Sequence, residues 1–395
     1  MGTTLYKTKT IIMPTEMPRI VGNNQFKGTT IVAIDGGYSS VKGCSTLKSF
    51  CFPSYAKRIS KDTQILGELE EASILLKDNK TQSFWAIGEL AEKMMNKEDL
   101  DSTTDKYLFD RYRYQTDIYK IIMTAGLGIA LIGTSANNDV YLQTGLPSAY
   151  EKDDSEELIS ILQGDYDFEI KVGNAEYIPI KVTLPSSNIH VMEQPKGTMY
   201  SCLYSHSGIP IIENKSITTK RTIIQDIGFG TEDIFNIRNN ISCGSKTYSD
   251  TGMKAVFEEV LDNINREYHT SFKIFEFQKF LESGKLSYFD RKSFSAKDIE
   301  FEELLYQTNN KLCSKSINRL LQENGNLMDY DYLIVTGGTG ESRYNQTKEL
   351  LKGLSHLQVI PGNIGDKRFP IMFSNVRGYY MRLYNYLYYK RKNNK

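Results

Sequence analysis

The stretch IVAIDGGYSSVKG, residues 31–43, decides the fold. A run of β-branched and apolar residues, typical of a buried strand, ends in Asp35, and Gly36 and Gly37 follow at once. Two residues without side-chain bulk let the backbone turn tightly and aim several N–H groups at one anion. Lys42 then supplies a compact cation that can reach a phosphate oxygen. The stretch therefore predicts a strand that ends in a phosphate-binding turn.

Two further apolar strands end in the same way. RTIIQDIGFG (221–230) contains Asp-x-Gly at its end, and DYLIVTGG (331–338) runs into Thr-Gly-Glu. Ligands of open α/β sheets lie at the carboxyl ends of strands. One glycine turn alone could be a tight hairpin, but the repetition predicts a site for nucleotide phosphates. No turn matches the Walker A or the dinucleotide-binding motif.

The side chains at these turns fit phosphate chemistry. Asp35 and Asp226 are hard carboxylates suited to Mg²⁺, which keeps several of its waters. Thr231 follows the second turn and can donate a hydrogen bond to phosphate. Phosphoryl transfer needs mainly positioning and charge neutralisation, which these groups supply. Taken singly, each aspartate could instead be a turn or helix-cap residue, and Lys42 an exposed lysine.

Composition narrows the class of protein. The 395 residues, 40% of them hydrophobic and 24% charged, can form two medium-sized domains. Lys and Arg number 48 and Asp and Glu also 48, which weighs against a large non-specific DNA-binding face and permits self-association. The five cysteines lack a C-x-x-C pair and the four histidines are dispersed, so neither a disulfide framework nor a zinc site is expected. A reducing cytoplasm is the expected location.

Hydrophobic periodicity predicts an α/β fold throughout. Helices are expected over about 114–133, 251–268 and 302–325 and near the C-terminus, and strands over 29–35, 138–147, 221–230 and 331–338. The apolar segment 121–133 is too short to span a bilayer and is expected to be a buried helix. Residues 1–28 form an extension, for which a flexible arm is favoured over an added strand.

The ordered set of turns resembles the actin/DnaK-chaperone/sugar-kinase ATPase superfamily. DGGYSSVKG is similar to its first phosphate loop, DIGFGTED to its second and VTGGTGE to its adenosine loop. Within the superfamily the chain resembles the bacterial ParM/Alp type, the plasmid-segregating actins, over about 29–390. The further stretches that carry this resemblance are WAIGELAEK (85–93), LQTGLPSAYEKD (142–153), VMEQPKGTMYS (191–201) and FSNVRGYYM (373–381).

The resemblance implies an α/β, actin-like fold of two domains, each a mixed sheet flanked by helices, with the nucleotide in the interdomain cleft. Domain I would comprise 29–195 and 358–395, with an insert subdomain at about 46–88. Domain II would comprise 196–357, with a small subdomain at about 254–305. Residues 1–28 would precede both domains as the N-terminal extension.

The resemblance also assigns the site residues. ATP, with GTP as an alternative, and Mg²⁺ held through water by Asp35 and Asp226 are the implied cofactors. Glu151 and Asp226 are the catalytic candidates, and Gln143 is a weaker candidate for orienting the hydrolytic water. Phe229 stands where the second loop usually has glycine, and Tyr38 where the first usually has a small hydroxyl residue. The implied nucleotide-binding residues are Asp35, Gly36, Gly37, Tyr38, Ser39, Ser40, Lys42, Gly228, Phe229, Gly230, Thr231, Gly337, Gly338, Thr339 and Glu341.

The implied function is that of a cytoplasmic, ATP-dependent bacterial actin. It would form filaments that segregate plasmid DNA and that hydrolysis destabilises. The expected partners are other copies of the chain and a DNA-bound adaptor of the ParR type, with no direct nucleic-acid binding and no membrane. The stretch 270–300, which mixes aromatic and charged residues, is either a filament contact or an ordinary pair of helices.

Other classes of the superfamily remain open. A soluble phosphotransferase of the sugar- or acetate-kinase type would need a catalytic aspartate in an acceptor loop, and no convincing one is found. A chaperone-type ATPase would need a following peptide-binding domain, for which the chain is expected to be too short. A cell-shape actin would use an amphipathic membrane helix, which Pro14 and Pro18 would break in the N-terminal segment.

Overall fold

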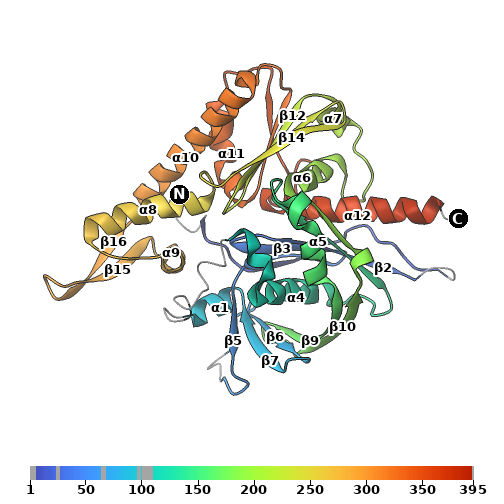
Figure 1. Cartoon of the computed structure of the whole chain (residues 1–395), viewed down its shortest axis with the longest axis horizontal. Coiled ribbons are helices and arrows are strands. Elements are labelled where there is room, and N and C mark those ends of the chain that lie inside the picture. The colour runs from blue at the N-terminus through green and yellow to red at the C-terminus, as the bar shows by residue number, and fades with distance from the viewer. Residues whose placement is uncertain (1–5, 24–26, 64–67, 96–98, 100–109, 394–395) are drawn as a thin grey trace. The chain divides into compact units, whose positions relative to one another are not determined.

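The computed structural model describes residues 6–23, 27–63, 68–95, 99 and 110–393 as an α/β protein (Figure 1). The chain divides into two compact units. The larger unit comprises Thr8–Ser216 and Gly362–Lys395, and the smaller unit comprises Met1–Lys7 and Ile217–Pro361. The chain therefore passes from one unit to the other near residues 216 and 361. We expected these domain boundaries at residues 195 and 357.

The central sheet of the larger unit carries the first glycine turn. Its strand order is β1-β4-β3-β2-β8-β11, with β2, β3 and β4 in an antiparallel meander and β8 and β11 added in parallel. The strands are β1 (Ile11–Pro14), β2 (Thr29–Gly36), β3 (Ser40–Ser45), β4 (Lys48–Pro53), β8 (Asp139–Leu146) and β11 (Ile189–Glu193).

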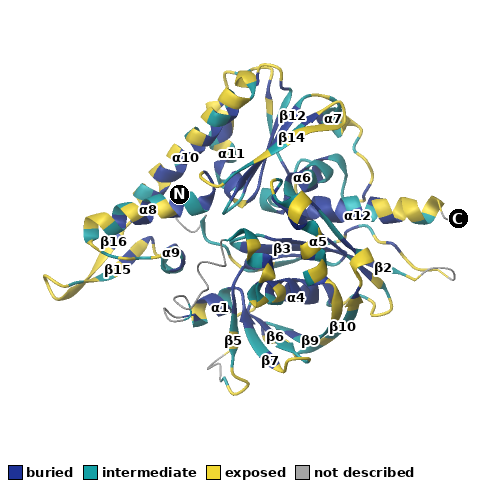
Figure 2. Cartoon of the chain, in the orientation of Figure 1, coloured by how far each residue is buried: buried dark blue, intermediate teal, exposed yellow. Residues whose placement is uncertain are grey.

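Two helices cover opposite faces of this sheet (Figures 1 and 2). Val32 and Ile34 of β2 pack in the core that contains helix α4 (Asp117–Leu131). Ile31 and Ala33, which alternate with them, pack in the core that contains helix α12 (Ser374–Asn393). A strand that is covered on both faces needs apolar residues at successive positions rather than at every second one. This explains the continuous apolar run from which the strand was predicted.

A second sheet of the larger unit lies against the other side of α4. Its order is β10-β9-β6-β7-β5, so the insert expected at 46–88 is completed by strands from residues 164–184. The strands are β5 (Ala56–Ile59), β6 (Ile74–Asp78), β7 (Ser83–Ile87), β9 (Gly164–Val172) and β10 (Ile178–Leu184). The other helices of this unit are α1 (Glu89–Met94), η2 (Arg111–Gln115), α5 (Glu151–Leu162), η3 (Ser186–Asn188), α6 (Gln194–Leu203), η4 (Glu213–Lys215) and η6 (Ile371–Phe373).

Helices α6 and α12 cross at two glycines. A Cβ atom built on Gly378 would lie 1.6 Å from the carbonyl oxygen of Gly197, so no larger residue fits there. Beside the crossing, the fully buried Arg377 donates from Nη1 to the Ser201 carbonyl at 2.7 Å and from Nη2 to the Tyr204 carbonyl at 2.9 Å. This packing keeps α6 with the larger unit, although we expected domain II to begin at residue 196.

Part of the N-terminal extension is an added strand. Residues Ile11–Pro14 pair antiparallel with β4, and Met17 and Ile20 are buried in the core beneath α12. The expectation of a flexible arm is therefore wrong for these residues, because β4 offers an open edge and the core offers apolar contacts. Residues 1–5 and 24–26 lie outside the described residues.

The sheet of the smaller unit carries the second and third glycine turns. Its order is β14-β13-β12-β17-β18, and β12 and β17 run parallel. The strands are β12 (Thr222–Ile227), β13 (Glu232–Arg238), β14 (Ile241–Tyr248), β17 (Tyr332–Thr336) and β18 (Gln358–Pro361). The helices are α7 (Ser216–Thr219), α8 (Met253–Tyr268), α9 (Ile274–Phe280), α10 (Glu302–Glu323), η5 (Gly325–Leu327) and α11 (Gly338–Leu350).

The stretch 270–300 is a helix followed by a β-hairpin, not a pair of helices. Strands β15 (Lys285–Asp290) and β16 (Ser295–Glu300) pair antiparallel and extend away from α8 and α9 (Figure 1). Leu286 and Ile299 on one face are buried in the core formed with α8 and α10. The alternation of apolar residues is short here, which explains why periodicity alone did not identify the strands.

The crossing of α6 and α12 gives a stability prediction. The Gly378→Ala substitution would push a methyl group against the Gly197 backbone. We therefore expect the free energy of unfolding, measured by urea denaturation, to fall by about 3 kcal/mol. Gly353→Ala, where no atom lies within 4 Å of the new Cβ, is the control and should change stability by less than about 0.5 kcal/mol. Equal stability of the two variants would contradict the close crossing.

Candidate nucleotide-binding site

The first loop is positioned by the register of β2 and β3. Asp35 lies directly opposite Lys42 in this pair, and Lys42 Nζ is 3.9 Å from Asp35 Oδ2. Gln194 Nε2, at the start of α6, donates to Asp35 Oδ1 at 2.9 Å. The carboxylate is buried, with 5% of its residue surface exposed. The hairpin thus holds an acid and a cation side by side at the end of a buried strand.

The backbone of this loop is fixed from outside by side chains. The Gly37 carbonyl accepts from Ser54 Oγ at 2.7 Å and from Arg113 Nη1 at 2.7 Å. Tyr38 lies beneath the Arg113 guanidinium, whose Cζ is 4.2 Å from the ring centroid. Sequence reasoning missed both Ser54 and Arg113, because neither belongs to a glycine turn.

The second loop, in the smaller unit, is a closed turn. Gly228 N donates to the Thr231 carbonyl at 2.8 Å, and Lys254 N at the start of α8 donates to the Phe229 carbonyl at 2.8 Å. The Phe229 ring packs on Phe257 with 5.7 Å between centroids, within the core beneath α8. A large residue is therefore accommodated at the usual glycine position because its side chain turns into the core.

The third loop lies against the second. Asp226 pairs with Thr336 in the parallel register of β12 and β17, so both loops leave the same edge of the sheet. Thr339 Oγ1 donates to the Gly228 carbonyl at 2.7 Å. Gly337 has φ 87°, and a Cβ there would be 2.6 Å from Asp226 Oδ1, so only glycine leaves room for the carboxylate. Gly338 and Glu341 lie in the first turn of α11.

A buried polar network supports these two loops from behind. Glu232 Oε1 accepts from Gln225 Nε2 at 2.7 Å and from Ser316 Oγ at 2.5 Å, and its other oxygen accepts from Thr251 Oγ1. The fully buried Arg343 of α11 donates to the Thr251 carbonyl at 2.7 Å. Burial lowers the pKa of Arg343. The network ties β12, β13, α10 and α11 to the segment that precedes α8, and no local sequence pattern indicated it.

The two candidates for orienting water have different surroundings. Gln143 of β8 is fully buried, its Nε2 donates to the His190 carbonyl at 3.0 Å, and its Oε1 accepts from Arg382 at 2.8 Å. Glu151 is the first residue of α5 and is half-buried, with its backbone N 3.1 Å from the Pro147 carbonyl oxygen. The Gln143 side chain is thus hydrogen-bonded within the core of the larger unit. Glu151, by contrast, is the first residue of the helix that follows the same strand.

The predicted nucleotide-binding residues therefore form one cluster in each unit, and Glu151 lies apart from these loops at the start of α5. Asp35 to Lys42 lie together in the larger unit, and Asp226 to Thr231 with Gly337 to Glu341 lie together in the smaller unit. The described residues contain no group of three His, Cys, Asp or Glu side chains that could hold a metal ion. The carboxylates in these clusters are Asp35 in the larger unit and Asp226 and Glu341 in the smaller unit. So few carboxylates suit a Mg²⁺ that keeps several of its waters better than a fully protein-bound ion.

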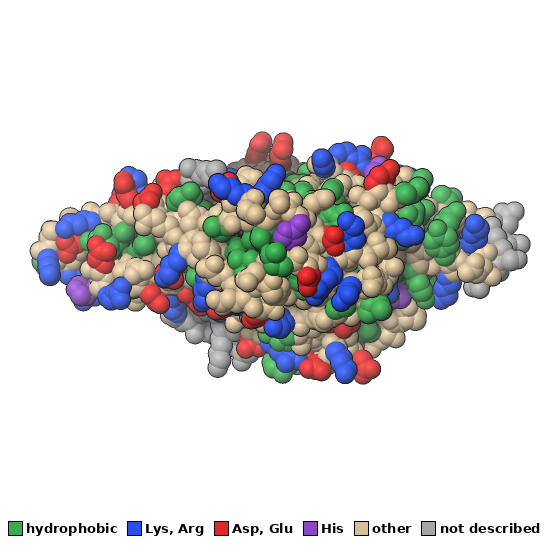
Figure 3. Space-filling model, turned by 90° about the horizontal axis from the view of Figure 1, so that it is seen from above, with side chains coloured by type: hydrophobic (Ala, Val, Ile, Leu, Met, Phe, Trp, Pro, Cys, Tyr) green, Lys and Arg blue, Asp and Glu red, His purple; other side chains and the backbone are tan. Residues whose placement is uncertain are grey.

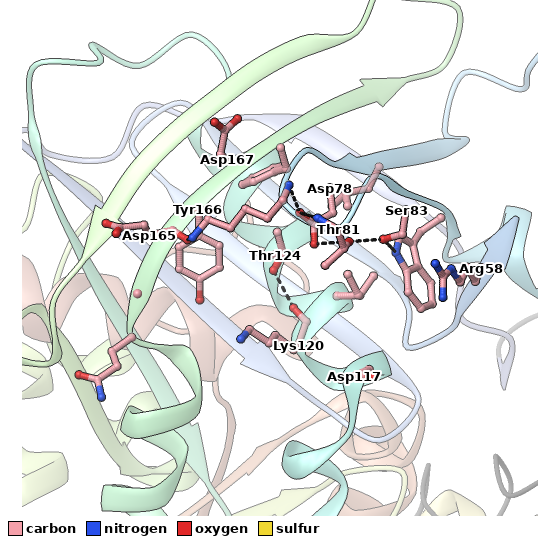
Figure 4. A pocket seen from close by; sticks show the side chains of 17 residues that line it. Arg58, Asp78, Thr81, Ser83, Asp117, Lys120, Thr124, Asp165, Tyr166 and Asp167 are labelled. Carbon is pink, nitrogen blue, oxygen red and sulfur yellow. Dashed lines mark hydrogen bonds between the residues drawn. The ribbon is translucent and has the colours of Figure 1, made fainter. Parts of the chain in front are cut away.

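A pocket of about 440 Å³ lies elsewhere in the larger unit, between α4 and the second sheet (Figure 4). Tyr166, Lys120 and Trp85 are among its lining residues, and none of the predicted nucleotide-binding residues is. Its polar groups largely satisfy one another: Trp85 Nε1 donates to Ser83 Oγ at 2.8 Å, and Lys80 Nζ to the Asp165 carbonyl at 2.6 Å. These lining groups therefore do not require a ligand to complete their hydrogen bonds.

The surface carries charges of both signs. On the face shown in Figure 3, Lys and Arg side chains are interspersed with Asp and Glu, in keeping with the balanced composition. Among the described helices, none combines the length and the hydrophobicity needed to cross a bilayer.

Comparison with known proteins identifies the fold. Residues 33–197 match the family model of the actin-like proteins N-terminal domain. No curated protein matches the chain. The solved structures that resemble it include a pCBH ParM non-polymerisable quadruple mutant, at 19% identity and TM-score 0.69, covering 90% of this chain and 99% of that one. The chain thus has the actin-like two-domain fold, which confirms the predicted fold class.

Two further similar structures are a ParM and an archaeal actin homologue. The ParM of a 15-stranded filament from Clostridium botulinum is 19% identical, with TM-score 0.66 and coverage of 89% of this chain and 97% of that one. The archaeal actin homologue Ta0583 in complex with ADP is 14% identical, with TM-score 0.59 and coverage of 90% and 99%. The resemblance to actins of the ParM/Alp type, indicated by the motifs, is therefore confirmed.

Proposed function

We propose that this chain is an ATP-dependent, filament-forming actin that segregates plasmid DNA and whose filaments hydrolysis destabilises. The observation that carries the proposal is the pair of glycine loops, one in each unit, each built at a strand end beside a buried aspartate. The similarity to a ParM in a filament and to an actin homologue bound to ADP supports it.

In this proposal both loops contact the phosphates of one nucleotide. Lys42 neutralises phosphate charge, and Thr231 donates from the second loop. Asp35 and Asp226 would hold Mg²⁺ through water, and the ion would neutralise phosphate charge. Glu151 orients the attacking water from the start of α5. Either ATP or GTP fits these contacts, because none of them reads the base.

The proposed partners follow from the same class. The chain binds copies of itself, and a DNA-bound adaptor of the ParR type links the filament to plasmid DNA. The interspersed surface charge supports a protein that does not hold DNA directly, since DNA binding requires clustered Lys and Arg. A cytoplasmic location belongs to the same proposal.

Assembly with hydrolysis tests the proposal against a phosphotransferase. After Mg-ATP is added to the full chain at several concentrations, 90° light scattering should rise above a critical concentration and decay as phosphate is released. A flat trace with slow, concentration-independent phosphate release would contradict filament formation and favour a sugar- or acetate-kinase-like enzyme. Assembly only in the presence of lipid vesicles would favour a cell-shape actin.

Asp226 provides the sharpest test of the metal role. Asp226→Asn keeps the size of the buried side chain but removes its charge, so Mg²⁺-dependent phosphate release should fall at least about a hundredfold. Asp329→Asn, at an exposed aspartate of the same unit with 77% of its side chain accessible, is the matched control and should hydrolyse like the unmodified chain. Unchanged turnover in Asp226→Asn would remove Asp226 from the site.

The tip of the β15–β16 hairpin is the proposed filament contact in the 270–300 stretch. Phe289 and Phe294 are 60% and 82% exposed and lie edge to face with 6.3 Å between ring centroids. The hairpin beneath them is held by ion pairs between Lys297 and Asp290 at 2.6 Å and between Lys285 and Glu300 at 2.8 Å. A second copy of the chain is the proposed occupant, because exposed aromatic side chains that pack on each other are typical interface anchors.

The hairpin contact predicts an assembly defect without a folding defect. The double variant Phe289→Ser, Phe294→Ser should raise the critical concentration for assembly by about fivefold or more, measured by light scattering and sedimentation. Met328→Ser, at another exposed apolar residue of the smaller unit, is the control and should assemble normally. An unchanged critical concentration in the double variant would exclude the hairpin tip from the filament interface.

A further inference from the structure

Arg113 holds the first phosphate loop by its backbone. Its Nη1 donates to the Gly37 carbonyl at 2.7 Å, and its Nη2 donates to the Gly36 carbonyl. The planar guanidinium also lies over the Tyr38 ring at 4.2 Å and near the Tyr119 ring at 5.4 Å. One side chain, distant in sequence, thus contacts three consecutive residues of the loop.

The turn that carries Arg113 is itself fixed at both ends. Asp110 Oδ1 accepts from Tyr112 N at 2.8 Å where η2 begins. At its end, Thr116 Oγ1 donates to the Arg113 carbonyl at 2.7 Å and accepts from Tyr119 N at 3.1 Å, which also caps α4. Because the backbone of the arginine is held in this way, its side chain is anchored rather than free to follow the loop.

The planarity of the peptide unit links the direction of each held carbonyl to the direction of the next residue's N–H group. No cis peptide bond occurs in the described part of the chain, and in a trans unit the C=O and the N–H point in opposite directions. Holding the Gly36 and Gly37 carbonyls on one side therefore turns the N–H groups of Gly37 and Tyr38 to the other side. Successive backbone N–H groups that face one way form an anion-binding concavity.

We propose that Arg113 is a positioning residue that pre-orients the Gly37 and Tyr38 amides for nucleotide phosphates. The inference rests on the proposed function, because it takes ATP as the anion. It requires the forked guanidinium, since two carbonyls are held at once while the flat group stacks on Tyr38. A lysine would keep the positive charge and lose the fork.

Equilibrium binding to the full chain tests this role. Arg113→Ala and Arg113→Lys should each weaken ATP binding by about tenfold, while the affinity for adenosine, which has no phosphate, stays within about twofold. Arg111→Ala is the matched control: Arg111 lies on the same turn, but its Nε and Nη2 donate to Asp154 at 2.9 and 2.8 Å, away from the loop. ATP binding to this variant should be unchanged.

A second measurement reads the amides themselves. When ATP is added, hydrogen–deuterium exchange of the Gly37 and Tyr38 amides should slow in the Arg111 variant and slow much less in both Arg113 variants at equal nucleotide occupancy, because the amides are no longer held towards the phosphates. Exchange at the β2 strand itself should not change, which shows that the fold is intact.

The outcomes separate the alternatives. ATP binding by Arg113→Lys at the level of the unmodified chain would mean that charge alone matters and would overturn the positioning role. Equal loss of ATP and adenosine would show a general structural defect and overturn it as well. An unmodified chain that binds neither ATP nor GTP would overturn the proposed function together with this inference, whereas unaltered binding in both Arg113 variants would overturn the inference alone.

Discussion

The pairing of β2 with β3 is the constraint on which the first cluster of site residues depends. It places Asp35 opposite Lys42 and Gly36 opposite Val41, and it leaves Gly37 to Ser39 as the turn between the strands. A slip of one residue would move every side chain of β2 to the other face of the sheet. Val32 and Ile34 would then leave the core under α4, and Ile31 and Ala33 the core under α12. The site geometry is therefore fixed by burial on both faces rather than by the loop itself.

Strand register also positions the candidate site residues of the smaller unit, where a parallel strand pair takes the place of the hairpin. The β12–β17 register sets Asp226 beside Thr336, so two loops separated by more than a hundred residues leave one sheet edge together. Their contact is tight enough that Gly337 must lack a side chain to leave space for the Asp226 carboxylate. The Glu232–Arg343 network joins the elements behind them, because Thr251 donates to Glu232 through its hydroxyl and accepts from Arg343 through its carbonyl.

The sequence predicted those parts of the structure whose signal is local. The apolar strands, the glycine turns and the long helices at 251–268 and 302–325 follow from periodicity and turn chemistry, and the structure has them within a few residues. The strand at Ile11–Pro14, the β15–β16 hairpin and the place of α6 depend on partners far along the chain, so composition could not decide them. For the same reason Ser54, Arg113 and Gln194 were missed: each reaches the first loop from another element.

The two departures from the usual loop sequences show how a site tolerates large residues. Tyr38 and Phe229 stand where the resembling loops usually have small residues, in turns that the proposed function brings close to phosphate. Each ring has a partner within its own unit, Arg113 over Tyr38 and Phe257 against Phe229. Because each ring packs on its partner, the Tyr38 and Phe229 side chains lie away from the backbone N–H groups that bind phosphate in the proposed function. A loop motif of this kind is therefore better judged by where its side chains pack than by whether each position is small.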